Sequence, residues 1–436
     1  MSRLASRIEA ALAGSTLADP LPATAVAFVE ARSGDPEAAA LPDPALRGLA
    51  RAIASQPEVA VFLSHRSHFL ERIARLAPGA LEARAESFPL DAQAILALDL
   101  EAALDALRSR RREEQAFAAC ADLGGLSSFG TVSSFLSLLA ESTVDTALAL
   151  ARRELRADAH DEFSVIGMGK LAGRELTYHS DLDLIFLYRG GRELIAQACR
   201  TGQRLISYLT TMTGAGIAYP VDTRLRPSGG QGMLVTSFDA FLRYQLEEAQ
   251  TWEHLALLRA RAVAGARGAA DLLDRVHAHI LSLRLPPWEE LAELRRQVRA
   301  ERADETKGAI ALKTGDGGLM DVDFLAGGGL LERGTPDFPV VPSVPAMLRA
   351  CAAGPRVDAL LADYRLLRVV EARTRWVRGR GVEAFVPDAS ADVIAELVEP
   401  GLASASLIAR LEAARERIHA AYEAVVAENA LAALER

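Results

Sequence analysis

Residues 163–188 read FSVIGMGKLAGRELTYHSDLDLIFLY, and this stretch decides the expected fold. Phe163 to Gly169 is a short apolar run that ends in glycines, which is typical of a buried strand. A helix is expected to begin at Lys170, directly after these glycines. Leu182 to Tyr188 is a second apolar run, and it starts beside two acidic residues. The stretch therefore predicts two strands joined through a glycine turn.

More strands are expected farther along the chain. Residues 217–227 predict a third strand, which is closed by Pro227 and a turn at Ser228-Gly229-Gly230. Residues 232–236 predict a fourth. The stretch 193–213 has the length of a helix and separates the second strand from the third. The middle of the chain is therefore expected to be an α/β core.

Helices are expected on both sides of this core because apolar residues recur there with the 3.6-residue period. Residues 1–160 are predicted to be helical, and Arg108, Arg110, Arg111 and Arg112 are predicted to form a solvated helix face. After the core, a short extended piece is expected at 310–313. The separate helices are predicted at 92–119, 133–155, 252–264, 271–283, 289–303, 357–378 and 403–434. The predicted division is 1–160, 161–265 and 266–436, an α+β architecture with helical regions flanking the core.

Composition limits the classes of function. The chain has 436 residues with 49 basic and 58 acidic side chains, a net charge of −9. This balance argues against a nucleic-acid-coating role, which relies on neutralising phosphates. Its three cysteines are far apart and form no zinc or disulfide pattern. We find no signal-peptide core and no long uncharged apolar run, so we expect a cytoplasmic protein without a membrane span.

Two acidic residues carry the expected chemistry. Asp181 and Asp183 lie at positions i and i+2 at the start of a strand, so their side chains project to the same side. Neighbouring carboxylates repel each other unless a cation lies between them, and this favours a hard divalent ion. Asp222 on the next strand can supply a third carboxylate, and three can bind two magnesium ions. Two solvated turn acids remain the alternative for a lone pair of aspartates.

Several neighbours suit a phosphate ligand. Gly167 and Gly169 allow close approach of the backbone, and the helix that begins at Lys170 offers free N–H groups. Ser180 can bond a phosphate or cap a turn, and the sequence leaves both open. If the third strand extends through residue 226, Arg224 and Arg226 lie on the same face as Asp222. They can then clamp phosphates or neutralise the carboxylates.

These residues resemble the glutamine synthetase adenylyltransferase family, part of the DNA polymerase β-like nucleotidyltransferase superfamily. The resemblance covers about 119–372 and is closest to the adenylylating unit of the two-unit family members. The family pattern also includes Lys313 and the block at 321–324. In this block Asp323 stands where the family usually has glutamate. Three consecutive glycines from 327 to 329 are expected to weaken the following helix. The matching segments are GMGKLAGREL at 167–176, SDLDLIF at 180–186, VDTRLRPSG at 221–229, GMLVTS at 232–237, TWEH at 251–254, RAR at 259–261 and DVDF at 321–324.

The resemblance implies an enzyme that transfers AMP from ATP to a tyrosine of glutamine synthetase. It implies Asp181, Asp183 and Asp222 as catalytic and magnesium-binding residues, and glutamine synthetase as the partner. It also admits a PII-type nitrogen-signalling protein as a second partner. Nucleotide contacts are implied near Gly167, Gly169, Lys170, Ser180, Arg224 and Arg226.

Two alternatives stay open from the sequence. The chain can be a stand-alone deadenylylating enzyme that works by phosphorolysis, or an adenylyltransferase for another protein. It can also be a catalytically silent regulatory module, although all three carboxylates are present.

Overall fold

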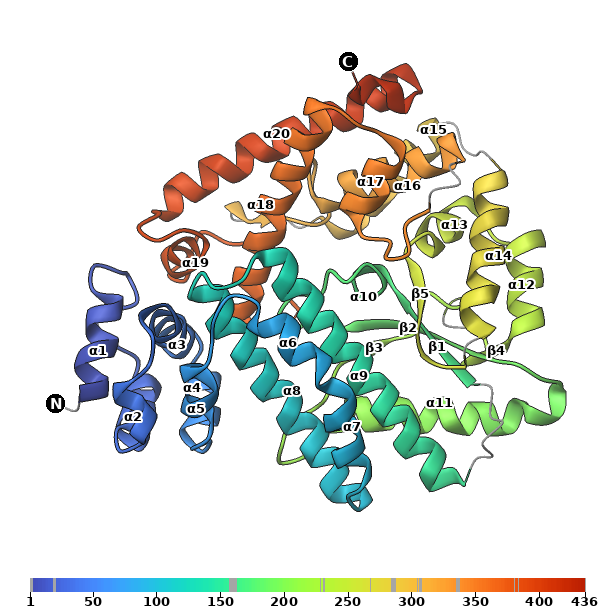
Figure 1. The fold of residues 1–436 in the computed structure, drawn as a ribbon. Coiled ribbons are helices and arrows are strands. Elements are labelled where there is room, and N and C mark those ends of the chain that lie inside the picture. The colour runs from blue at the N-terminus through green and yellow to red at the C-terminus, as the bar shows by residue number, and fades with distance from the viewer. Residues whose placement is uncertain are drawn as a thin grey trace.

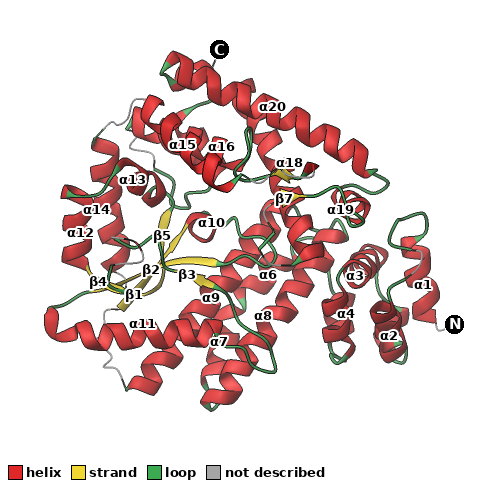
Figure 2. Ribbon diagram, turned by 180° about the vertical axis from the view of Figure 1, so that it is seen from behind, coloured by secondary structure: helices red, strands yellow, loops and turns green. Residues whose placement is uncertain are grey.

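The computed structural model describes residues 3–18, 21–156, 163–227, 229, 232–266, 268–283, 288–303, 305, 308–334, 338–379, 381–382 and 384–435. Helices make up most of the described chain, and a small mixed sheet lies among them (Figure 2). The predicted α+β class is therefore confirmed. Figure 1 shows the sheet between the N-terminal helices α1–α9 and the C-terminal helices α15–α20.

The N-terminal region is helical, as predicted. Its elements are α1 (Arg3–Leu12), α2 (Ala23–Arg32), the 3-10 helix η1 (Pro36–Ala39), α3 (Asp43–Ser55), α4 (Pro57–Ser64), α5 (Phe69–Ala74), α6 (Ala80–Glu86), α7 (Phe88–Leu96), α8 (Leu100–Leu123) and α9 (Phe129–Leu155). The prediction of a single helix at 92–119 is wrong, because α7 ends at Leu96 and a separate helix, α8, begins at Leu100. The Asp99 carboxylate accepts a hydrogen bond from the backbone N–H of Ala102 at 2.9 Å and so starts a new helix.

The arginine run on α8 is also not the solvated face that charge patterning predicted. Arg108 is fully buried, and Arg111 is nearly so. The guanidinium of Arg108 donates to the carbonyls of Tyr208 and Thr211 at 2.9 and 3.0 Å. A buried guanidinium needs such acceptors, and here they lie at the end of a helix that is remote in sequence.

Helix α9 is the one described helix that is long and apolar enough to cross a membrane. Of its most apolar window, 67% is buried inside the protein, which is also usual for a core helix of a globular domain. Cys120, Cys199 and Cys351 are free thiols, as the spacing predicted.

The central sheet contains β1 (Phe163–Met168), β2 (Leu182–Tyr188), β3 (Val221–Asp222), β4 (Val235–Ser237) and β5 (Ala260–Gly265). Its order is β3-β2-β1-β5, and β4 also pairs with β2. Strand β1 is antiparallel to β2 and β5, whereas β2 is parallel to β3 and β4. The first two strands are confirmed. The third strand is much shorter than predicted. In the turn predicted to follow it, Ser228 and Gly230 lie outside the described residues.

Strand β5 was not predicted, since its alanine-rich sequence was assigned to a helix at 252–264. The observed helix α13 (Thr251–Leu257) ends earlier, and the chain then pairs with β1. Pairing along a central strand overrides the local preference for helix.

Both faces of the sheet are buried, which explains the continuous apolar runs of β1 and β2. Phe163, Val165 and Phe186 join the core formed with the N-terminal helices. Ile166, Ile185 and the side chains that alternate with them join the core formed with the C-terminal helices. The helices around the sheet are α10 (Gly169–Ala172), the 3-10 helix η2 (Arg192–Leu194), α11 (Ile195–Thr210), α12 (Phe238–Glu247), α13 and α14 (Gly268–Ser282).

The remaining elements are α15 (Trp288–Arg302), β6 (Ile310–Ala311), α16 (Leu319–Arg333), α17 (Val344–Cys351), α18 (Pro355–Arg378), β7 (Ala384–Phe385), α19 (Ala391–Val398), α20 (Ser404–Glu428) and the 3-10 helix η5 (Leu431–Leu434). Strands β6 and β7 form an antiparallel pair. Helix α18 also reaches the N-terminal region, where the Trp376 indole N–H donates to the hydroxyl of Ser55 at 2.9 Å. The division at 160/161 and 265/266 remains a prediction.

The three consecutive glycines of α16 are packing residues. A Cβ at Gly327 would lie 2.4 Å from Leu255 Cδ1, one at Gly328 2.6 Å from Trp288 Cη2, and one at Gly329 2.7 Å from Cys351 Sγ. The expected loss of helix propensity is therefore offset by close approach of α13, α15 and α17.

We predict that Gly328→Ala lowers the melting temperature, although alanine is the better helix former. The methyl group would meet the buried ring of Trp288, and overpacking costs about 1–3 kcal/mol against a propensity gain of about 1 kcal/mol. Thermal unfolding by circular dichroism measures the effect. Gly130→Ala in α9 is the control, because its Cβ would meet only Ser128 Oγ at 3.8 Å. Equal melting temperatures for both variants would contradict the packing argument.

Candidate functional site

The three predicted carboxylates lie at one end of β2. Asp183 on β2 is the Cα partner of Asp222 on the parallel strand β3, and Asp181 immediately precedes β2. Burial raises the pKa of Asp183 to about 6, and the negative charges of Asp181 and Asp222 act in the same direction. Three carboxylates that interact in this way form an acidic cluster made only of oxygen donors, which suits a hard cation.

Asp222 faces Arg224 in this structure. Its carboxylate accepts the backbone N–H of Arg224 at 2.8 Å and the guanidinium Nε and Nη2 at 2.9 and 2.5 Å. These hydrogen bonds hold the pKa of Asp222 below its usual value. Among the described residues, no group of three His, Cys, Asp or Glu side chains is arranged to hold a metal ion. Asp222 is instead paired with Arg224, whose exposed guanidinium can leave at little cost.

The strand alternation that was expected to place Arg224 and Arg226 on the face of Asp222 is wrong, although the charges of both arginines lower the pKa of Asp222. Strand alternation requires a strand, and β3 ends at Asp222. The chain then turns, so Arg224 reaches back to Asp222. Arg226 instead donates to the carbonyl of Thr223 at 2.7 Å and to that of Gly232 at 3.3 Å, which stabilises the turn.

Gly167 near the end of β1 and Gly169 directly after it have different roles. Gly169 adopts a φ of +54°, which glycine tolerates best, and a Cβ there would lie 3.7 Å from an Asp183 carboxylate oxygen. Its N–H donates to the carbonyl of Arg259 at 2.8 Å. A Cβ at Gly167 would instead meet Val263 at 2.8 Å and Leu171 at 2.9 Å. Only Gly169 therefore brings the backbone beside the carboxylates, while Gly167 permits packing of β5 and α10.

Lys170 and Ser180 are engaged within the protein. The ammonium of Lys170 pairs with Glu371 of α18. Burial lowers the pKa of Lys170 to about 7, and the cations Arg368, Arg375 and Lys313 act in the same direction. The buried hydroxyl of Ser180 accepts the backbone N–H of Thr177 at 3.1 Å. In this arrangement Ser180 stabilises the turn that leads into Asp181.

Lys313 is a functional candidate that the analysis of individual residues missed. It follows β6, and its positive charge opposes the upward shift in the pKa of Asp183. Lys313 therefore lies close enough to interact with the carboxylate cluster, although it is far away in sequence. Its place in the family pattern was the signal in the sequence that could have identified it.

Arg259 connects the glycine turn to the C-terminal helices. Its guanidinium donates to Asp323 of α16 at 2.7 Å and to Glu175 at 2.6 Å. Glu175 also accepts the hydroxyl of Tyr364 at 3.0 Å and the backbone N–H of Val344 at 3.1 Å. This set of contacts joins the segment after α10 to α16, α17 and α18.

We predict that Arg259→Met lowers the free energy of unfolding by about 3–5 kcal/mol, because it leaves the largely buried Asp323 and Glu175 without their cation. Chemical denaturation followed by fluorescence gives the value. Arg333→Met serves as the matched control, since its pair with Glu435 is 40% and 37% exposed and is expected to matter little. A loss for Arg259→Met as small as that of the control would refute the role of Arg259.

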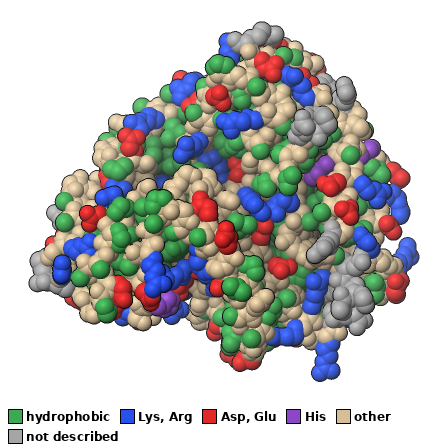
Figure 3. Space-filling view, in the orientation of Figure 1, with side chains coloured by type: hydrophobic (Ala, Val, Ile, Leu, Met, Phe, Trp, Pro, Cys, Tyr) green, Lys and Arg blue, Asp and Glu red, His purple; other side chains and the backbone are tan. Residues whose placement is uncertain are grey.

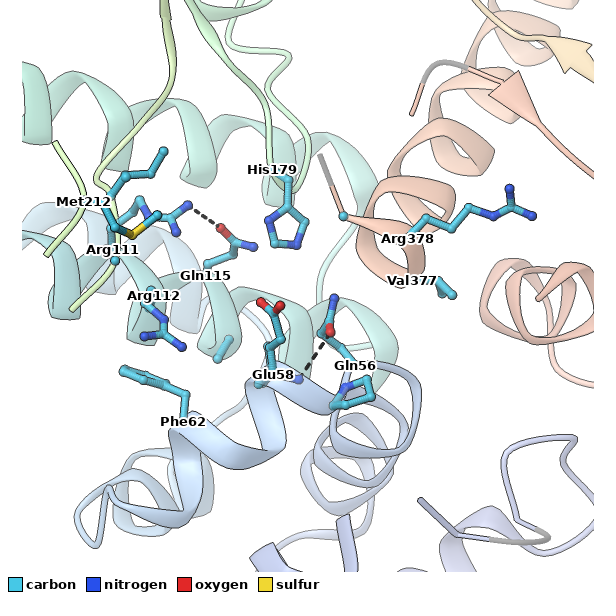
Figure 4. Close-up of a pocket in the computed structure, with 16 residues that line it drawn as sticks. Gln56, Glu58, Phe62, Arg111, Arg112, Gln115, His179, Met212, Val377 and Arg378 are labelled. Atoms are coloured by element: carbon cyan, nitrogen blue, oxygen red, sulfur yellow. Dashed lines mark hydrogen bonds between the residues drawn. The ribbon is translucent and has the colours of Figure 1, made fainter. Parts of the chain in front are cut away.

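A cavity of about 780 Å³ is lined by His179 and by residues of α4, α8 and the end of α18, but not by Asp181, Asp183 or Asp222 (Figure 4). His179, two residues before Asp181, projects into it from one side and Glu58 of α4 from another. Arg112 lies over the ring of Phe62, 4.3 Å from its centroid. The N-terminal helices therefore help to shape the surroundings of the site.

Comparison with known proteins identifies the family. Residues 46–275, more than half of the chain, match the model for glutamate-ammonia ligase adenylyltransferase. The bifunctional glutamine synthetase adenylyltransferase/adenylyl-removing enzyme of Xanthomonas campestris pv. campestris is 39% identical over 282 residues, which are 60% of this chain and 29% of that protein. The protein with the same description from Xanthomonas axonopodis pv. citri is 36% identical over 328 residues, 70% of this chain and 32% of that protein.

The chain belongs to the glutamate-ammonia ligase adenylyltransferase family. The family match begins at residue 46, so it includes N-terminal helices that the motifs alone did not connect with the family. The aligned part spans about a third of the length of these curated relatives.

Proposed function

We propose that this chain transfers an adenylyl group from ATP to a tyrosine of glutamine synthetase. The observation that carries the proposal is the acidic cluster of Asp181, Asp183 and Asp222 beside the Gly169 turn, in a chain of this family. We further propose that the five-stranded sheet and its helices form a nucleotidyltransferase core. Such an enzyme would act in the cytoplasm, with glutamine synthetase as partner and a PII-type protein as a candidate regulator.

The acidic cluster fits magnesium by its chemistry. All six carboxylate oxygens are hard donors, and burial together with the negative charges of Asp181 and Asp222 raises the pKa of Asp183. Asp181, Asp183 and Asp222 would hold the ion, and Asp222 would first leave Arg224. Bound magnesium would supply charge neutralisation for the triphosphate and the reacting oxygens.

The protein side chains then have separate tasks. The tyrosine hydroxyl oxygen forms a bond to the α-phosphorus of ATP, the bond from that phosphorus to the bridging oxygen breaks, and pyrophosphate leaves. A carboxylate of the cluster, Asp222 by its position, accepts the hydroxyl proton. Arg224, released from Asp222, and Lys313 stabilise negative charge on the phosphoryl oxygens. Gly169 allows the nucleotide to approach without a Cβ in its path.

We predict that Asp181→Asn and Asp183→Asn each lower adenylylation by at least about a hundredfold, because each removes a charge that holds magnesium. The assay incubates the protein with α-labelled ATP, magnesium and purified glutamine synthetase. Asp145→Asn on the exposed face of α9 is the control and should retain activity. Wild-type labelling by Asp181→Asn would exclude this mechanism. Release of label from adenylylated synthetase by phosphate, without forward labelling, would assign the reverse reaction.

We also predict that Arg224→Gln leaves the fold intact and lowers kcat/KM for ATP by about 10- to 100-fold, as expected for one lost charged hydrogen bond. Its guanidinium is largely exposed, so little packing is lost. Steady-state kinetics at saturating glutamine synthetase measures the effect. Arg243→Gln, an exposed arginine on α12, is the matched control. If Arg224→Gln keeps the wild-type kcat/KM, Arg224 has no role beyond its contact with Asp222.

A further inference from the structure

A second cavity, of about 600 Å³, lies where α9, α17 and α18 meet the segment that follows α10. In the space-filling view, Lys and Arg side chains surround a hollow near the middle of the face, in the region where Figure 1 places these helices (Figure 3). None of Asp181, Asp183 and Asp222 lines this cavity.

Its lining is basic. Arg174, Arg349, Arg365 and Arg368 face only two lining carboxylates, Glu175 and Asp358. Glu175 is already compensated by Arg259, Tyr364 and the N-terminus of α17. Asp358 lies 3.5 Å from Arg349 in a pair that is mostly exposed. Arg174 and Arg368 pair with carboxylates outside the lining, Glu141 and Glu371. Within the described ranges, Arg365 has no carboxylate partner, so Arg365 supplies the excess positive charge of the cavity.

The first turn of α9 supplies hydrogen-bond donors to the same cavity. Ser128, Phe129 and Gly130 line it, and the Ser128 hydroxyl accepts only the N–H of Thr131. A Cβ at Gly130 would meet only Ser128 Oγ, at 3.8 Å, within 4 Å. The N–H groups of Phe129 and Gly130 begin this 27-residue helix, have no acceptor among the described contacts and carry partial positive charge.

Ser133 gives an independent indication that a ligand belongs there. It lines the cavity one turn into α9 and is only 4% exposed. Its hydroxyl has no hydrogen-bond partner among the described residues. A buried hydroxyl without a partner costs free energy, and an acceptor-rich ligand in the cavity would satisfy it.

We propose that this cavity binds the phosphate group of a small molecule. A phosphate oxygen accepts from Ser133 and from the N–H groups of α9, while Arg365 and Arg349 balance its charge. The volume is within the range of small-molecule sites and leaves room for an organic group on the phosphate. The site is separate from the carboxylate cluster, and it shares Glu175 and Arg368 with the buried contacts around Arg259 and Lys170.

The test is calorimetric titration of the full chain with glycerol 3-phosphate and, separately, inorganic phosphate in magnesium-free buffer. We expect saturable binding that Arg365→Gln and Arg349→Gln each weaken at least about tenfold. Ser133→Ala should weaken it about three- to tenfold. Arg275→Gln, an exposed arginine on α14, should bind like the wild type. Circular dichroism confirms that each variant is folded.

Tighter binding of the ester than of inorganic phosphate would identify a phosphate ester as ligand, and equal binding would identify free phosphate; both support the site. Three results overturn it. These are no binding of either probe, binding that neither arginine variant weakens, and binding that appears only with magnesium, which would assign it to the carboxylate cluster. None of these results depends on whether the chain adenylylates glutamine synthetase.

Discussion

The contacts of Arg259 hold the candidate site together. Its carbonyl fixes the N–H of Gly169 beside Asp183, while its guanidinium bridges Glu175 and Asp323. One residue at the start of β5 thus links the sheet, the glycine turn and α16. Because desolvated charges need their partners, this bridge constrains how far the C-terminal helices can move relative to the carboxylates.

The need of desolvated charges for partners also applies to Lys170, which was predicted to contact a phosphate and instead forms an ion pair within the protein. Lys170 pairs with Glu371, which also pairs with Arg368 and Arg375 of α18. A lysine held in this way anchors α10 to α18 instead of presenting its ammonium to solvent. In the proposed reaction, positive charge for a triphosphate would come from Lys313 and from the exposed Arg224.

The sequence predicted those parts whose signal is local. The apolar runs of β1 and β2, bounded by glycines and aspartates, identified these strands, and the pairing of β2 with β3 brings Asp183 and Asp222 together. The predictions that failed concern segments and side chains whose structure depends on contacts with residues outside their own local sequence. β5 is alanine-rich and becomes a strand only against β1. Arg108 is buried only because the end of α11 offers carbonyls, and Arg224 turns back because β3 stops after two residues. The roles of the site residues remain predictions.

The electrostatics of Asp222 suggest how the cluster can change state. With Arg224 on Asp222, one of three neighbouring charges is compensated. Burial, with the repulsion from Asp181 and Asp222, raises the pKa of Asp183 to about 6. A divalent cation would relieve that repulsion more fully than one exposed guanidinium, because it contacts several carboxylates at once. Exchange of Arg224 for the cation would then free the guanidinium beside the carboxylates, where the proposed reaction brings in phosphate charge. Thus the hydrogen bonds from Arg224 to Asp222 also keep an arginine beside the carboxylate cluster.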